Sequence, residues 1–156
     1  MAAVYESLPN ELKATLLKLN AVHDALPLFG AGLAPERYAK FRAELQPQVH
    51  PVVRTHPESG EKILYVNQAF TTHFENFAGV TADAYRTGLD YKQAEMTALQ
   101  ELFKVTAAPE YQVRLKWKAN TVAIWDNRST QHYAVSDYLP ARRVMNRASI
   151  VGERPF

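Results

Sequence analysis

The hydrophobic pattern near the start of the chain has a helical period. Apolar side chains recur at spacings of three and four from Leu8 to Leu26, which predicts one amphipathic helix with a single buried stripe. Ser7 precedes this run and is suited to cap the helix, because its hydroxyl accepts from free N–H groups of the first turn. Pro9 then falls in the first turn, where a missing N–H is tolerated.

Two later segments carry the same helical spacing. Apolar side chains between Tyr38 and Leu45 predict a second, shorter helix. Apolar side chains between Leu99 and Phe103 predict another helix, which ends before Pro109. Residues 75–95 show little periodicity and read as a loop with a short helical turn.

Alternating and short apolar runs predict strands in the rest of the chain. Residues 50–67 read as a β-hairpin around turn-forming residues 57–60. Residues 111–117 alternate strictly between apolar and polar, which is typical of a half-buried strand. After a turn at Lys118–Asn120, residues 121–125 return as a strand.

A last strand is predicted at about residues 142–151. Helices first, followed by strands that pair antiparallel, favour a sheet-rich α+β fold in one domain, residues 1–156.

Composition excludes several function classes. The net charge is only +2, from 18 basic and 16 acidic residues without blocks of like charge, which argues against nucleic-acid binding. The chain has no cysteine and no apolar run long enough for a membrane span. Its first residues lack the layout of a signal peptide, so a cytoplasmic location is expected.

Two arginines near the C-terminus are candidates for anion binding. Arg143 and Arg147 share one face of the predicted strand and lie roughly 13 Å apart, at about 3.3 Å per residue. If that face is inward, each guanidinium needs an anion such as a carboxylate, sulfonate or phosphate. The alternative is that one arginine faces solvent and the other pairs with Asp126 or Asp137.

Two blocks of sequence support the anion-binding interpretation. The later block reads WDNRSTQHYAVSDYLPARRVMNR, from Trp125 to Arg147. The earlier block contains HPVVRTHP from His50, then LYVN from Leu64, and Phe70 followed by threonine. In this order the two blocks resemble the TauD/TfdA family of Fe(II)- and 2-oxoglutarate-dependent dioxygenases, over nearly the whole chain.

The resemblance implies a fold and a set of roles. The fold would be part of a double-stranded β-helix, or jelly roll, with flanking helices. His132 would be a metal ligand, the distal one of the iron, and Arg143 would bind the far carboxylate of 2-oxoglutarate. Arg147 and Phe70 would bind the substrate. Asp126 and the following asparagine would fix the loop that carries the ligand.

The family's early His-x-Asp pair of iron ligands is absent from this chain. His56 and His73 each begin a His-x-Glu triplet, but the first lies in a predicted turn and the second follows a segment where the family places no ligand. The chain is therefore expected to be the C-terminal part of a dioxygenase domain. Exposed edges of an incomplete jelly roll favour association, so a homo-oligomer is expected.

Three hypotheses about function follow. The first is a dioxygenase of the taurine or alkylsulfonate type, which hydroxylates a carbon near the anionic group of a small sulfonate, sulfate ester or carboxylate. The absent ligand pair leaves the activity of the isolated chain in question. It favours the second hypothesis, a non-catalytic, truncated family member that acts as a binding or interaction domain. The third is a cupin-like small-molecule binding module that never used iron.

Overall fold

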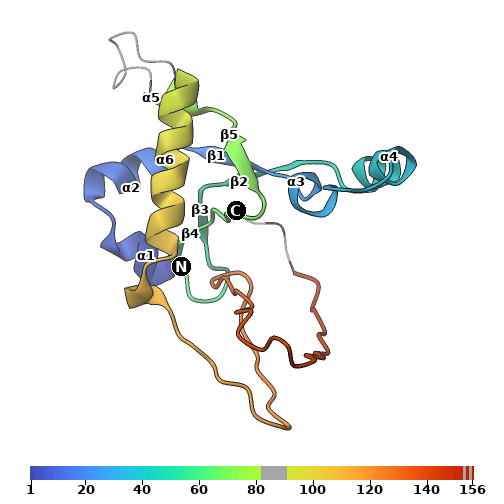
Figure 1. Ribbon diagram of the computed structural model, residues 1–156. Coiled ribbons are helices and arrows are strands. Elements are labelled where there is room, and N and C mark those ends of the chain that lie inside the picture. The colour runs from blue at the N-terminus through green and yellow to red at the C-terminus, as the bar shows by residue number, and fades with distance from the viewer. Residues whose placement is uncertain (82–90, 153, 155) are drawn as a thin grey trace.

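The computed structural model describes residues 1–81, 91–152, 154 and 156, and its helices and strands precede residue 112 (Figure 1). In chain order the elements are α1 (Ala2–Ser7), α2 (Asn10–Leu16), β1 (Asn20–His23), α3 (Leu26–Phe29), α4 (Pro35–Glu44), β2 (Gln48–Pro51), β3 (Val53–Thr55), β4 (Lys62–Leu64), β5 (Thr71–Phe74), α5 (Phe77–Thr81), α6 (Tyr91–Thr106) and the 3₁₀ turn η1 (Pro109–Tyr111). Part of the stretch predicted as loop, residues 82–90, lies outside the described residues. The fold mixes helices with antiparallel sheets, which confirms the α+β class, but helices and not strands make up most of the described regular structure, so the fold is not sheet-rich.

Two small sheets meet at one bend of the chain. β1 is the central strand of the first sheet and pairs antiparallel with β2 on one side and β5 on the other. β3 and β4 form the second sheet, with Val53 opposite Leu64. The N–H of Tyr65 donates to the carbonyl of Val52 across 2.7 Å, which ties the end of β4 to the bend between β2 and β3.

The predicted hairpin and both later helices are confirmed. β3 and β4 pair around residues 57–60, and Gly60 has a φ of +73°, a conformation that glycine adopts without steric cost. The turn at Lys118–Asn120 is also present, with Asn120 at a φ of 62°, which asparagine tolerates. α4 and α6 cover the two segments with helical spacing.

The single helix predicted over residues 8–26 is wrong. α1 ends at Ser7, whose hydroxyl donates to the carbonyl of Val4 instead of capping a helix that follows. Pro9 separates α1 from α2, because the residue before a proline favours extended backbone. The second half of the segment becomes β1, since pairing with β2 and β5 satisfies its backbone on both sides.

The strands predicted at residues 111–117, 121–125 and 142–151 are not formed as regular strands. Alternating apolar and polar residues determine which face of a strand would be buried. A strand also needs a neighbouring strand that pairs with its backbone hydrogen-bonding groups. No described strand pairs with these segments, and Figure 1 shows them as a long loop that extends from the end of α6 and returns to the body. At its end, the N–H of Thr55 donates to a terminal carboxylate oxygen of Phe156 across 2.8 Å.

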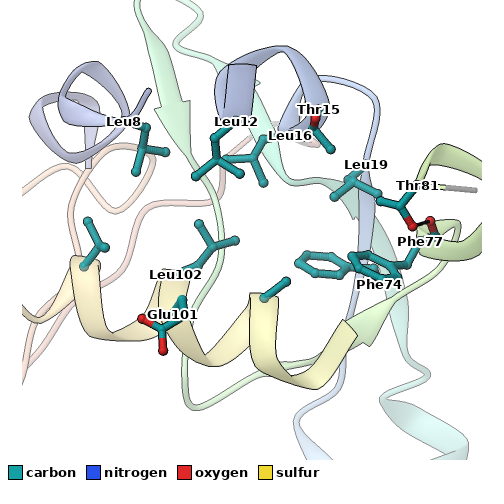
Figure 2. A pocket seen from close by; sticks show the side chains of 12 residues that line it. Leu8, Leu12, Thr15, Leu16, Leu19, Phe74, Phe77, Thr81, Glu101 and Leu102 are labelled. Atoms are coloured by element: carbon teal, nitrogen blue, oxygen red, sulfur yellow. Dashed lines mark hydrogen bonds between the residues drawn. The ribbon is translucent and has the colours of Figure 1, made fainter. Parts of the chain in front are cut away.

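The core lies between α1, α2, the two sheets and α6. Leucines predicted for the buried stripe do enter it, including Leu8, Leu16 and Leu19, although they come from different elements. Phe74 and Phe77 stack with ring centroids 5.7 Å apart and face Leu102 of α6. Figure 2 shows these side chains around an apolar cavity of about 180 Å³ that the helices do not fill.

Within the residues that the structure describes, none of the helices combines the length and the apolar character needed to span a bilayer.

Candidate functional site

His132 lies on the long loop that follows α6, and its side chain is exposed. The imidazole lies against the indole of Trp125, with ring centroids 5.0 Å apart and planes tilted by 47°. The indole N–H in turn donates to the side-chain oxygen of Asn127 across 3.0 Å. The turn before His132 therefore has a defined shape, and Asn127 helps to fix it as predicted.

A cluster of charged groups attaches this loop to the β3–β4 hairpin. We call it the hairpin clasp, and its members are His56, Glu58, Asp126 and Arg128. His56 Nδ1 accepts backbone N–H groups from the hairpin turn, at 3.1 and 3.3 Å, so the proton of the ring lies on Nε2. That N–H donates to Asp126 Oδ2 across 3.1 Å. Asp126 therefore fixes the loop, as predicted.

Arg128 completes the hairpin clasp. Its Nε and Nη2 donate to the Asp126 carboxylate at 2.7 to 3.0 Å, and its Nη1 pairs with Glu58 at 2.8 Å. The hydrogen bonds from Arg128, together with the one from His56, hold the pKa of the Asp126 carboxyl well below its usual range. Asp126 is thus a fixed anion near neutral pH.

Two further hydrogen bonds hold the same loop against the body. The N-terminal ammonium of Met1 donates to the carbonyl of Ser129 across 3.0 Å. The side-chain amide of Gln131 donates to the carbonyl of Val66, just beyond β4. The residue before His132 is therefore attached directly to the hairpin.

The two arginines predicted to bind anions also lie on this exposed part of the chain. The guanidinium carbon of Arg143 lies over the ring of Tyr138, 5.6 Å from its centroid. Arg147 is exposed. Among the described residues, no hydrogen bond or ion pair joins His132, Arg143 and Arg147 to one another. Their shared site stays a prediction.

Phe70 comes immediately before β5 and packs on Phe29 at the end of α3, with ring centroids 6.0 Å apart. Phe29 itself is 54% exposed, so this aromatic pair presents an apolar surface to solvent. Phe29 gives no sequence signal, because it lies among prolines and glycines without hydrophobic periodicity. The role of His56 is not visible in the sequence either, since its partner Asp126 is remote along the chain.

The comparisons with known proteins bear on these residues. The model of the taurine catabolism dioxygenase TauD, TfdA family matches residues 1–149. The chain belongs to this family. All the predicted site residues, from Phe70 to Arg147, fall inside the matched range.

Relatives of known name agree with the TauD, TfdA assignment. The alpha-ketoglutarate-dependent sulfate ester dioxygenase of Pseudomonas putida is 37% identical, over 99% of this chain and 49% of that protein. The alkylsulfatase of Acinetobacter baylyi is 37% identical, over 96% of this chain and 45% of its own length. The chain spans about half the length of the curated relatives it matches.

A solved structure agrees with the TauD, TfdA family assignment. The crystal structure of a taurine dioxygenase from Burkholderia xenovorans superposes with a TM-score of 0.58 at 30% identity, over 82% of this chain and 35% of that one. The TauD, TfdA family uses 2-oxoglutarate (α-ketoglutarate) as co-substrate, as the names of its members state, and it implies Fe(II) as the metal.

The described residues do not make a complete iron site. A site of this type needs two histidines and a carboxylate on one face of the metal. No group of three or more His, Asp or Glu side chains in the described part of the chain is arranged to hold a metal ion. The carboxylate on the His132 loop, Asp126, is already engaged by His56 and Arg128. The side chains of the described residues therefore do not by themselves support a chemical step at iron.

Proposed function

We propose that this chain is the C-terminal part of an Fe(II)- and 2-oxoglutarate-dependent dioxygenase with a partial jelly-roll fold. Its substrate would be a small sulfonate or sulfate ester, hydroxylated at a carbon near the anionic group. The observation that carries the proposal is the family match over residues 1–149, which contains the His132, Arg143 and Arg147 pattern. Relatives named as sulfate ester and sulfonate dioxygenases support the substrate class.

Each proposed role follows from the chemistry of the side chain. Arg143 would bind the far carboxylate of 2-oxoglutarate, because its planar fork matches two carboxylate oxygens. Arg147 would bind the anionic group of the substrate in the same way. His132 would contribute one imidazole ligand to the iron. The aromatic pair of Phe70 and Phe29 offers an apolar surface for the carbon chain of the substrate.

Calorimetric titration with 2-oxoglutarate tests the cofactor role. Arg143→Ala is expected to weaken binding on the order of a hundredfold, the cost of a charge-assisted hydrogen-bonded pair. Arg142→Ala is the matched control, because it removes the same charge from the adjacent residue, to which no role is assigned. An equal loss of 2-oxoglutarate affinity in both variants, or no loss in either, would contradict the role of Arg143.

Turnover tests the reaction. Succinate release coupled to loss of an alkyl sulfonate or sulfate ester is expected from the active protein, and Arg147→Ala should raise KM for that substrate far more than KM for 2-oxoglutarate. Equal effects on both constants would remove Arg147 from the substrate site.

A second function is favoured by one observation. The absence of a three-ligand metal group among the described residues fits a non-catalytic family member that acts as a binding or interaction domain. Anaerobic Fe(II) titration of the 156-residue chain distinguishes the dioxygenase from the non-catalytic binding domain. Stoichiometric binding that His132→Ala abolishes supports the dioxygenase, whereas absence of binding together with retained 2-oxoglutarate affinity supports the binding domain.

A further inference from the structure

Arg54 is the largest fully buried side chain in the described part of the molecule. It lies on β3 opposite Ile63 and is only 2% exposed. Its Nε and Nη2 have no hydrogen-bond partner among the described residues, and no described carboxylate forms an ion pair with it. Because a buried cation without a counter-charge costs several kcal/mol, this position calls for an anion.

The geometry of the unpaired atoms indicates which anion fits. Nε and Nη2 lie on the same edge of the guanidinium, and this edge binds the two oxygens of a carboxylate by parallel hydrogen bonds. His50 Nδ1 is buried close by and also has no partner among the described residues. A sulfate or phosphate would bring two additional oxygens, which a single imidazole N–H would not satisfy.

Aromatic rings enclose these donors. The guanidinium carbon of Arg54 lies 5.1 Å from the ring centroid of Tyr65, and His50 meets the same ring edge-on at 5.9 Å. His23 stacks on Tyr65 from β1. Burial lowers the pKa of His50, and the nearby charges of Arg154 and Arg54 lower it further. These side chains therefore supply positive charge around Arg54, and the terminal carboxylate of Phe156, which accepts from the Thr55 N–H, forms no ion pair with it.

We infer that Arg54 and His50 form a carboxylate-binding site, in which Arg54 Nε–H and Nη2–H hold the two oxygens and His50 Nδ1–H donates to one of them. The site uses none of the residues assigned to 2-oxoglutarate or substrate, and it does not depend on the proposed dioxygenase activity. The carboxylate has two sources that share this chemistry: a small free carboxylate, or an Asp or Glu side chain from a second copy of the chain.

NMR of the metal-free chain with ¹⁵N-labelled arginine tests the inference, because each Arg Nε–H gives its own signal. Titration with sodium acetate at constant ionic strength is expected to shift the Arg54 Nε–H signal downfield and saturably, while sodium chloride leaves it unchanged. A second-copy carboxylate would instead give the downfield signal without acetate, and dilution of the protein would remove it. A signal insensitive to both acetate and dilution would overturn the site.

Two variants assign the Arg54 Nε–H signal and test the role of its two paired guanidinium donors. Arg54→Lys keeps the charge but loses the paired donors, and is expected to weaken acetate binding about tenfold to a hundredfold. Arg37→Lys, at an exposed position of α4, is the matched control and should leave the titration unchanged. The titration of the unmodified chain stays decisive even if Arg54→Lys fails to fold.

Discussion

At the scale of single residues, His23 is the group whose protonation the fold controls most clearly. Its imidazole stacks on Tyr65 at 5.4 Å, meets His50 edge-on at 5.1 Å, and hydrogen-bonds Thr71 Oγ1 at 3.1 Å. Burial, followed by the charge of His50, lowers the pKa of His23 to about 4, against a weaker opposing hydrogen bond from the His23 ring to the backbone carbonyl of Tyr65. Folding therefore keeps His23 neutral.

This shift predicts that acid destabilises the chain in a defined window. The unfolded chain protonates His23 near its ordinary pKa of 6.5, whereas the folded chain does so only near 4, so the unfolded state binds more protons between these values. The free energy of unfolding should be at its full value above pH 6.5 and should fall as the pH drops toward 4. Urea unfolding at a series of pH values measures it.

A pair of variants isolates the contribution of His23. His23→Gln should reduce the fall in unfolding free energy on acidification. The fall that remains would come from His50, whose pKa is also lowered but which contributes less. His73→Gln, at an exposed position of β5, should keep the slope of the unmodified chain. An unchanged slope in His23→Gln would show that its pKa is not depressed by folding.

At the scale of elements, the hairpin clasp links two parts of the chain that are distant in sequence. The β3–β4 hairpin presents His56, and the loop before His132 presents Asp126 and Arg128. Because His56 uses both ring nitrogens, it fixes its own turn through Nδ1 and the loop through Nε2. The orientation of the His132 loop thus depends on the hairpin.

Replacement of His56 by phenylalanine should release this link. The variant keeps an aromatic ring but leaves the N–H groups of Glu58 and Ser59 and the Asp126 carboxylate without their imidazole partner, at a cost of about 1–3 kcal/mol in unfolding free energy. Hydrogen exchange at the Glu58 and Ser59 amides should accelerate. The corresponding change at His73, which is exposed, should alter neither quantity.

The apolar cavity beside α6 gives a second test at this scale. Ala98 lines the cavity of about 180 Å³ together with Leu16 and Phe74. Ala98→Leu adds three carbons to unfilled space and should stabilise the fold by about 2 kcal/mol, from roughly 0.8 kcal/mol per buried methylene. Thermal unfolding measures the change. Ala39→Leu, on the exposed side of α4, should change the melting temperature little, and a destabilised Ala98→Leu would show that the cavity does not accept the side chain.

At the scale of the whole molecule, much apolar surface is left uncovered after α6. Val113, Ile124, Ile150 and Val151 are each at least 94% exposed. These segments have strand-like alternation but no described strand beside them. Exposed apolar surface with unpaired backbone is typical of an interaction surface.

We therefore expect the chain to self-associate. Sedimentation velocity should show a mass that rises with protein concentration. Substitution of Val113, Ile124 and Ile150 by lysine should give a monomer, because charges on unpaired extended segments oppose edge-to-edge pairing.

A variant with the same added charge distinguishes the effect of the apolar surface on association from the effect of net charge. Lysines in place of Gln68, Gln93 and Gln100, which are exposed on other parts of the molecule, should leave the association intact. A monomeric parent chain at all concentrations would contradict the expected homo-oligomer.

The sequence by itself determined the local features and the family. The hairpin around Gly60, the turn at Asn120 and the helices at α4 and α6 follow from residue chemistry within a few positions, which the sequence displays directly. The two motif blocks likewise identified the TauD, TfdA family that the comparisons show. Such signals are legible because their physical causes are short-range.

Only the tertiary structure decided what depends on partners distant in the chain. The leucine pattern before Leu26 was interpreted as one helix, yet Asn20–His23 pairs between two strands that come much later. The link from His56 to Asp126, the contact of Phe29 with Phe70, and the unpaired burial of Arg54 have no sequence signal. Each arises from which segments meet in space, a property that local periodicity does not encode.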